Sequence, residues 1–186
     1  MSKIILGIDC SSTTIGWCVL SWDDVTNDIK FVKADYLKPT KTGSIIERII
    51  DTRNKIQKII EDNKPDVIAI EDIIKFMKGK STAQTIIMLT TFNRMIGLVA
   101  YDYLKTSPNL FSVMTIRHGL KINKIFPKKE DMPELVAKHL GITFPYEYGK
   151  KGAFKVENYD KADGIAVALY QAFVLAGIIK SKGKTK

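Results

Sequence analysis

Strand-forming hydrophobic residues are concentrated in three short segments of the first forty positions, which predicts three strands. The stretch "IILGID" (residues 4–9) has the composition of a short buried strand, and residues 14–22 follow as its hairpin partner after a turn at residues 11–13. Residues 28–37 alternate well enough to form a third strand. Because short turns join these segments, we expect each strand to pair antiparallel with the one before it.

The pattern then changes to a helical period. Between Ile45 and Ile60 isoleucines recur at helical spacing with charged residues mostly between them, which predicts an amphipathic helix that ends before Pro65. Ser44 precedes this segment and Glu47 follows three residues later. That pair predicts a capping box at the start of the helix.

Strands and helices alternate in the second half of the chain. The continuous apolar run "DVIAIED" (residues 66–72) is typical of a parallel strand covered on both faces. A long apolar helix over residues 81–104, a fifth strand over 111–116, and helices over 129–140 and 158–179 follow. The order predicts an α/β fold whose mixed five-stranded sheet has three antiparallel strands, then parallel ones, with helices on both faces.

The chain of 186 residues is long enough to bury a core without disulfides or metals as staples. We expect one domain over residues 1–179 and a basic, flexible tail over residues 180–186. Residues 143–157 form the longest irregular stretch and predict a loop.

Composition restricts the class of protein. Hydrophobic residues make up 45% of the chain and charged residues 26%, and no apolar run reaches the length of a membrane span. The strand pattern begins at once, so we expect neither a signal peptide nor contact with a membrane. Cys10 and Cys18 form no CxxC pair, which is typical of small buried side chains in a reducing cytoplasm.

The net charge of +9 favours a polyanionic partner such as nucleic acid, although a lysine-rich surface also serves solubility alone. Basic residues are concentrated in "KFMKGK" and between residues 117 and 129, where no acidic residue occurs. Both segments follow the ends of predicted strands. They therefore predict contacts with phosphates, which position DNA without reading its bases.

Acidic side chains stand at corresponding ends of the predicted elements. Asp9 ends the first strand and Glu71 ends "VIAIE", and neighbouring parallel strands end at the same edge of a sheet. Asp160 and Asp163 lie near the start of the last helix, and their spacing of three places both on one face. We therefore expect four carboxylates from three distant segments to converge at this edge.

Each of these residues also has a purely structural explanation. Asp9 can serve a turn, Glu71 can end a strand, and the helix macrodipole alone favours aspartates at a helix start. Four anions gathered together repel one another, however, and need divalent cations to be stable. Ligands that are all oxygens suit Mg²⁺ or Mn²⁺ rather than zinc, and two such ions can activate water and stabilise a leaving oxygen in phosphodiester cleavage.

Three motifs together resemble a known family. "GIDCSSTTIGW", "VIAIED" and "NYDKADGIAVALY" are similar, in order and spacing, to those of RuvC-type Holliday-junction resolvases in the RNase H-like nuclease superfamily. The resemblance extends from residue 4 to about residue 176. It implies an RNase H-like fold and a metal-dependent endodeoxyribonuclease that resolves four-way DNA junctions by symmetric paired nicks, in the cytoplasm of a bacterium or of a virus-infected host.

The resemblance also assigns roles to residues. It implies that Asp9, Glu71, Asp160 and Asp163 are the catalytic metal ligands for two Mg²⁺ or Mn²⁺ ions. On this hypothesis Asp9 bridges the ions, Glu71 and Asp163 each hold one, and Asp160 completes the set. Lys129 matches a family lysine that assists phosphate binding.

Further expectations concern DNA and a partner subunit. The family is homodimeric through the helix that corresponds to residues 81–104, although a plain core helix would show the same pattern. Family members carry an aromatic wedge after the glutamate, for which Phe76 is the candidate, and residues 144–155 are an elaboration of the family pattern. The predicted DNA-binding residues are Lys75, Phe76, Lys78, Lys80, Arg117, Lys121, Lys124 and Lys128.

The sequence leaves further functions open. The first hairpin also resembles that of actin-like sugar kinases, but those enzymes need two such domains to enclose ATP. A DNA-binding module without catalysis is a second rival, and a nuclease of the same superfamily that cuts RNA–DNA hybrids or flaps is a third. We predict a junction resolvase.

Overall fold

The structure is a computed structural model that describes residues 1–73 and 82–179. One sheet contains its five strands in the order β3-β2-β1-β4-β5. Their bounds are Ser2–Asp9 (β1), Ile15–Asp23 (β2), Ile29–Leu37 (β3), Val67–Asp72 (β4) and Asn109–Ser112 (β5). β1, β2 and β3 pair antiparallel, and β4 and β5 run parallel to β1. The predicted mixed sheet is confirmed.

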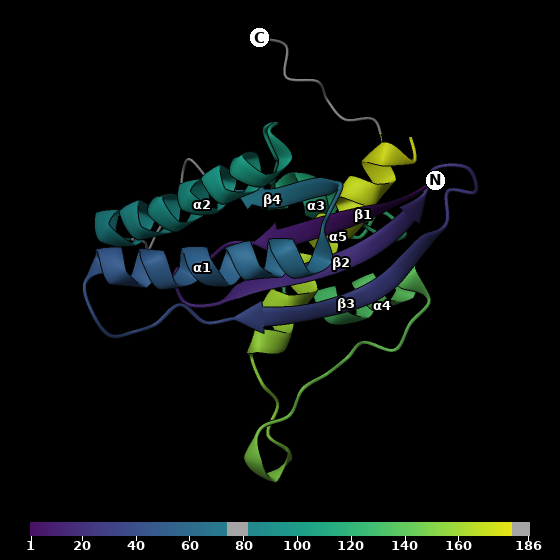
Figure 1. The fold of residues 1–186 in the computed structure, drawn as a ribbon. Helices are drawn as coiled ribbons and strands as arrows, with labels where there is room; N and C mark the ends of the chain where they lie inside the picture. The colour runs from purple at the N-terminus through teal and green to yellow at the C-terminus, as the bar shows by residue number, and fades with distance from the viewer. Residues whose placement is uncertain (74–81, 180–186) are drawn as a thin grey trace.

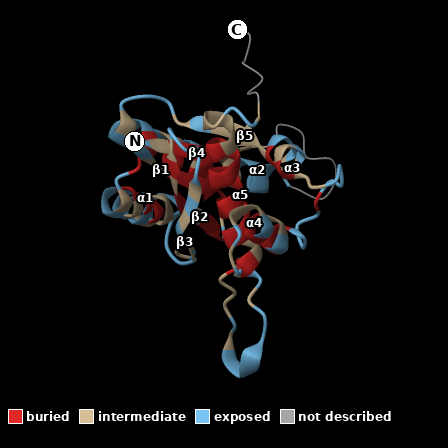
Figure 2. Ribbon diagram, turned by 90° about the vertical axis from the view of Figure 1, so that its right-hand side faces the viewer, coloured by how far each residue is buried: buried red, intermediate tan, exposed pale blue. Residues whose placement is uncertain are grey.

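Helices cover both faces of the sheet (Figure 1). They are α1 (Ile45–Asn63), α2 (Ala83–Leu104), α3 (Val113–Leu120), α4 (Met132–Leu140) and α5 (Glu157–Leu175), with a short 3₁₀ helix at Lys150–Gly152. α1 and α2 pack on one face around Phe92 and Ile56, whereas α3, α4 and α5 pack on the other. Figure 2 shows the buried residues concentrated between these layers.

Helix α5 is buried around its whole circumference between residues 161 and 172. A helix can lie so close to a sheet only where the facing residues lack side chains. A Cβ at Gly16 would lie 1.8 Å from the Asp160 carbonyl oxygen, and one at Gly164 would lie 2.6 Å from the backbone of Gly16. The backbone of α5 therefore rests directly on β2, which fixes the height of the acidic first turns of α5 above the sheet.

The fifth predicted strand, residues 111–116, is wrong from residue 113 onward, and β5 begins two residues earlier than predicted. β5 ends at Ser112, whose side chain accepts a hydrogen bond from the Thr115 amide at 3.2 Å and so caps helix α3. Ile116 and Leu120, four residues apart, are buried on one face of this helix. Over only a few residues, strand and helix periods cannot be told apart from an apolar run, and the cap decides for the helix.

Other boundaries shift by a few residues. α4 begins at Met132 rather than at residue 129, and Pro133 occupies its first turn, where a missing amide proton costs nothing. α5 ends at Leu175 rather than at residue 179, ahead of Gly177 with its positive φ of 70°. The predicted loop at residues 143–157 contains the 3₁₀ helix and a β-bridge between Tyr148 and Phe154.

The capping box of α1 is confirmed. The Ser44 hydroxyl accepts from the Glu47 amide at 3.2 Å, and the Glu47 carboxylate accepts from the Ser44 amide at 2.6 Å. In the part of the chain that the structure describes, no helix has both the length and the hydrophobicity for crossing a membrane.

We predict that Gly164→Ala destabilises the protein even though alanine favours helices. The added methyl would collide with the β2 backbone, which has no flexible end to move aside, and overpacking of this kind costs about 1–3 kcal/mol. Gly97 lies inside α2, and a methyl group added there would meet nothing within 4 Å, so Gly97→Ala is the matched control and stabilises by about 0.5–1 kcal/mol. Urea unfolding measures both; a gain of stability in Gly164→Ala would contradict the close approach.

Candidate active site

The sheet places Asp9 and Glu71 side by side. Asp9 is the last residue of β1, Glu71 lies near the end of β4, and the parallel pair Ile8↔Ile70 sets both carboxylates one residue further along neighbouring strands. Helix α5 crosses above this edge. The carboxylate oxygens of Asp9, Asp160 and Asp163 lie within 4.8 Å of one another.

The predicted convergence of carboxylates therefore occurs, with one distinction. Asp9, Asp160 and Asp163 form the tight group, whereas Glu71 lies outside that distance limit among the residues the structure describes. Glu71 is still close enough that its charge raises the pKa of Asp9 and that the charge of Asp163 raises its own. The geometry thus presents a trio of aspartates with a glutamate beside it.

Two cations face the trio. The Lys129 ammonium lies 3.0 Å from Asp160 and 3.7 Å from Asp163, and the Arg117 guanidinium lies 3.6 Å from Asp163. Lys129 exposes 45% of its side chain and Arg117 only 18%. Arg117, for which the sequence predicts a contact with DNA, lies on helix α3 against the carboxylates, and its role in DNA binding stays a prediction. The sequence pattern did not reveal this helix. The cap at Ser112 and the spacing of Ile116 and Leu120 were the signals for that helix.

Burial and mutual repulsion raise the pKa values of Asp9, Glu71 and Asp163. Burial, with the charges of Glu71 and Asp163, raises the pKa of Asp9 well above its usual range. Burial and the Asp163 charge raise the pKa of Glu71 to about 7, although Arg117 and Lys129 oppose the shift. Burial also raises the pKa of Asp163. For Lys129, burial lowers the pKa, but the hydrogen bond to Asp160 and the carboxylate charges outweigh it.

The raised pKa values of these carboxyl groups indicate whether a metal ion fits the site. Lys129 and Arg117 do not neutralise the cluster fully, because the pKa values of Asp9, Glu71 and Asp163 stay raised in their presence. A group of oxygen ligands from Asp9, Asp160 and Asp163, with Glu71 beside them, is the donor set that hard divalent cations such as Mg²⁺ or Mn²⁺ prefer. The residues present fit such ions.

Residues behind the site hold its strand ends in place. The buried Asn93 side chain on α2 donates to the Glu71 carbonyl at 2.7 Å, and Arg94 contacts the Asp72 carboxylate at 3.3 Å. No sequence pattern pointed to Asn93, because a polar residue inside an apolar helix has no periodic signal of its own. The structure shows that α2 is tied directly to the end of β4.

The remaining predicted DNA-binding residues divide into two sets. Lys121, Lys124 and Lys128 lie on the connection from α3 to α4, where the Lys121 ammonium contacts the His118 ring at 3.1 Å and Lys124 and Lys128 are exposed. The other four lie outside the described residues: Lys75, Phe76, Lys78 and Lys80. Their roles stay predictions.

The raised pKa of Glu71 predicts a pH-dependent stability for protein kept in a chelator. The folded state binds this proton more tightly than the unfolded chain, so the stability contributed by Glu71 is full below pH 4.5 and falls as the pH rises to about 7. Glu71→Gln removes that loss. We expect the variant to exceed the wild type by about 3 kcal/mol above pH 7 and by little at pH 4.5.

Thermal unfolding across this pH range measures the difference. Added Mg²⁺ should then stabilise the wild type more than the variant. A difference that is constant with pH, or largest in acid, would contradict the buried cluster.

Comparison with known proteins gives a consistent family. A family model described as "Crossover junction endodeoxyribonuclease RuvC" matches residues 5–112, more than half of the chain. The protein of that name from Rickettsia massiliae is 22% identical over 165 residues, which cover 89% of this chain and 94% of that protein. The one from Sulfurovum sp. is 39% identical over 69 residues, or 37% of this chain and 42% of that protein.

Solved structures show the same fold. The RuvC of T. thermophilus in complex with a Holliday junction substrate has a TM-score of 0.68 at 16% identity, and the match covers 92% of this chain and 94% of that one. The yeast mitochondrial Holliday junction resolvase Ydc2 has a TM-score of 0.65 at 16% identity, covering 92% and 78%. The fold is RNase H-like, as the sequence predicted. With its aspartate trio at the shared strand edge and a family match over more than half of its length, the chain belongs to the RuvC family of crossover junction endodeoxyribonucleases.

Proposed function

We propose that the protein is a structure-selective DNA endonuclease that resolves four-way junctions by symmetric paired nicks. The single observation that carries this proposal is the convergence of Asp9, Asp160 and Asp163 within 4.8 Å, in a chain of this family. Such a trio, with Glu71 beside it, is suited to bind cations that cleave phosphodiesters.

The four acidic residues are the proposed ligands of two Mg²⁺ or Mn²⁺ ions. When bound, such ions activate a water molecule for in-line attack on phosphorus and stabilise the leaving oxygen, which yields a 5′-phosphate and a 3′-hydroxyl. The protein supplies the fixed oxygens: Asp9 and Glu71 from rigid strand ends and Asp160 and Asp163 from a helix pressed on the sheet.

Lys129 and Arg117 have different proposed roles. Arg117 is mostly buried and contacts Asp163, so it holds that carboxylate in orientation. Lys129 is nearly half exposed and donates a hydrogen bond to the Asp160 carboxylate. A metal ion at that carboxylate would compete with this hydrogen bond. If metal ions were bound to the carboxylates, they would neutralise them, and the Lys129 ammonium would be available for a phosphate oxygen of the DNA. Lys121, Lys124 and Lys128 extend the positive surface beside it.

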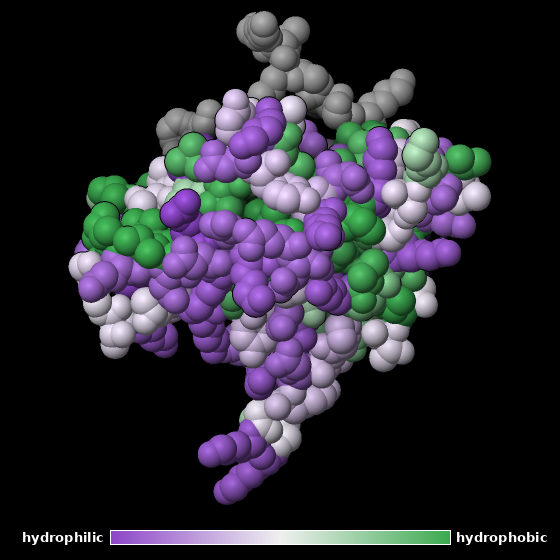
Figure 3. Space-filling view, in the orientation of Figure 1, coloured by the Kyte–Doolittle hydropathy of each residue, from purple (hydrophilic) through white to green (hydrophobic). Residues whose placement is uncertain are grey.

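A homodimer would place two such sites on the two strands that are nicked. Helix α2 offers the surface for it, since Ile87, Leu98 and Tyr101 are exposed at spacings of 11 and 3 that place them along one side of the helix. Leu98 is 65% exposed. Apolar side chains also gather at the N-terminal ends of α1 and α2, at the left of Figure 3.

The decisive experiment compares substrates. With Mg²⁺ or Mn²⁺, we expect paired nicks on a four-way junction and little cutting of linear duplex, flaps or RNA–DNA hybrids. Preference for the hybrid or the flap would instead identify another activity of the RNase H-like superfamily. Binding without any cutting would identify a module without catalysis.

Asp160→Asn tests the metal site. Loss of one anionic ligand should reduce junction cleavage by at least about 100-fold while binding of the junction is retained. The matched control is Asp62→Asn, the same chemical change on the exposed surface of α1, which should cut like the wild type. Single-turnover cleavage on a labelled junction measures both; undiminished cutting by Asp160→Asn would remove the trio from the mechanism.

Leu98→Glu tests the dimer. A charge in the centre of the α2 surface should convert the protein to monomers and uncouple the two nicks, so that singly nicked junctions accumulate. Val25→Glu, at a still more exposed position in the turn after β2, is the control and should stay dimeric. Light scattering after gel filtration measures the oligomeric state. Cleavage of a supercoiled cruciform plasmid measures whether the two nicks are coupled. A dimer that survives Leu98→Glu would exclude this surface.

A further inference from the structure

An arm formed by residues 144–156 projects from the body below β3 and α4 (Figure 1). Its two strands meet at the bridge between Tyr148 and Phe154, and the Gly149 amide donates to the Ala153 carbonyl at 2.7 Å. The tip turns through Lys151, whose φ of 59° is positive. The arm lies outside residues 5–112, which the family model matches.

Aromatic side chains stiffen the arm. Ring centroids are 4.7 Å apart between Phe144 and Tyr146, 5.9 Å between Tyr146 and Phe154, and 5.3 Å between Phe154 and Tyr159. Phe144 is buried in the core, and the series runs from there along the arm. Contacts of this kind each contribute about 0.5–1.5 kcal/mol beyond area burial. The arm is therefore a packed extension of the core rather than a loose loop.

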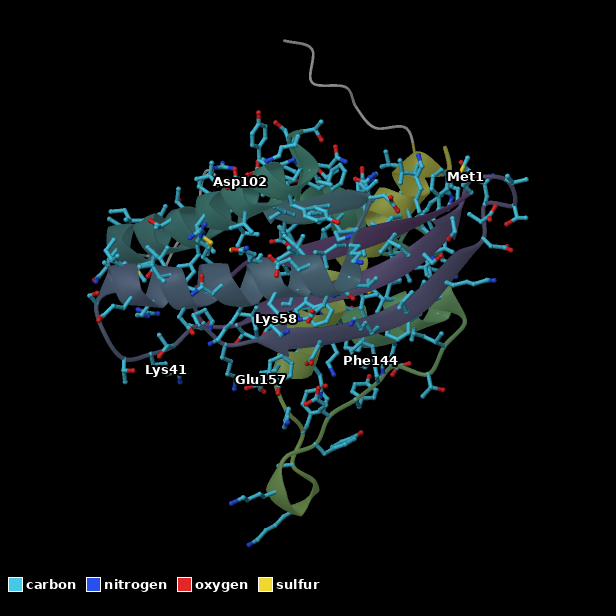
Figure 4. The ribbon with its side chains drawn as sticks, viewed as in Figure 1. Met1, Lys41, Lys58, Asp102, Phe144 and Glu157 are labelled. Atoms are coloured by element: carbon cyan, nitrogen blue, oxygen red, sulfur yellow. The ribbon has the colours of Figure 1, made fainter. Side chains whose placement is uncertain are left out.

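An ion network around the buried Lys161 fixes the base of the arm. The Lys161 ammonium, with only 3% of its side chain exposed, donates to the Glu147 carboxylate at 2.6 Å and to the Pro145 carbonyl at 3.0 Å. Lys155 contacts the same carboxylate at 3.0 Å, and these two lysines lower the pKa of Glu147 to about 2. Asn158 pairs with the Glu147 backbone through two hydrogen bonds. Figure 4 shows Phe144 and Glu157 where the arm joins the body.

This base lies on the same edge as the active site. The Tyr36 hydroxyl donates to Glu147 at 3.4 Å, Tyr36 pairs with Gly16, and Gly16 pairs with Asp9. Two strand spacings separate Tyr36 from Asp9, or roughly 10 Å. Four further residues to the tip add roughly 13 Å. The tip thus stands roughly 20 Å from the carboxylates, the length of about six base pairs.

The tip carries positive charge without compensation. Residues 148–156 contain Lys150, Lys151 and Lys155 and no acidic residue. Lys155 is paired with Glu147, but among residues 1–73 and 82–179 no carboxylate pairs with Lys150 or Lys151. Lysines that serve only solubility need no rigid support. Lys150 and Lys151, in contrast, lie on an arm that is held by stacked aromatic rings and by the ion network around Lys161.

From these contacts we propose that the arm binds the phosphate backbone of duplex DNA about six base pairs from the scissile phosphate. The inference rests on the proposed function, which supplies the substrate, and adds a contact outside the catalytic edge. Because the arm is stiff and attached directly before the helix that bears Asp160 and Asp163, it sets the angle at which a junction limb leaves the active site.

The test uses Lys150→Gln with Lys151→Gln, a double variant that removes charge but retains polarity and leaves the core untouched. Its matched control is Lys58→Gln with Lys138→Gln, two exposed lysines on α1 and α4. Each pair is placed in the Asp160→Asn background, and dissociation constants for a four-way junction are measured by fluorescence anisotropy over a range of salt concentrations. We expect the arm variant to bind about tenfold more weakly, with the slope of log affinity against log salt reduced by about 2.

A chemically modified junction locates the contact. Neutral methylphosphonates replace the phosphates five to eight base pairs from the scissile phosphate. The arm variant should lose nothing further on this junction, whereas the parent loses about tenfold. Equal weakening of the arm and control pairs, or a further loss of the arm variant on the modified junction, would overturn the proposal. If the wild type cuts junctions while the arm variant binds normally, only the arm inference fails; a wild type that cuts no junction refutes the proposed function itself.

Discussion

The contact between the backbones of α5 and β2 is the constraint on which the site depends. Gly16 and Gly164 face one another with no side chain between them, so the helix lies lower than a helix with ordinary residues could. At that height Asp160 and Asp163 reach the end of β1. If one methyl group raised the helix, its carboxylates would move further from Asp9. The added distance would be comparable with the length of a metal–oxygen bond. The geometry of the carboxylate cluster thus depends on the two glycines, which have no side chains to hold the helix away from the strand.

The same proximity creates an electrostatic problem that the protein solves only in part. Anions that are buried together raise one another's pKa, and Lys129 and Arg117 offset this without removing it. A fully neutralised cluster would have little affinity left for divalent ions. The incomplete compensation therefore favours metal binding at the expense of stability in the metal-free state, a common compromise where function needs like charges together.

Support for the site comes from both layers of the fold. On one face α2 holds the end of β4 through Asn93, and the exposed side of the same helix is the proposed dimer surface, so assembly and the Glu71 strand end share one rigid element. On the other face α5 joins the catalytic edge to the arm through Lys161 and Glu147. The two proposed DNA contacts, at the edge and at the arm, are thereby mechanically connected.

Much of the fold and of the candidate site could be predicted from local sequence. The strand-like segments predicted the sheet, and the capping box at Ser44 predicted the first helix. The motifs around Asp9, Glu71 and Asp160 identified the acidic residues. Neighbours along the chain suffice for such signals. The switch from β5 to α3 at Ser112, the contact of Arg117 with Asp163 and the burial of Lys161 against Glu147 were decided only in the tertiary structure. Each depends on which distant side chain arrives opposite, and no spacing within the chain encodes that.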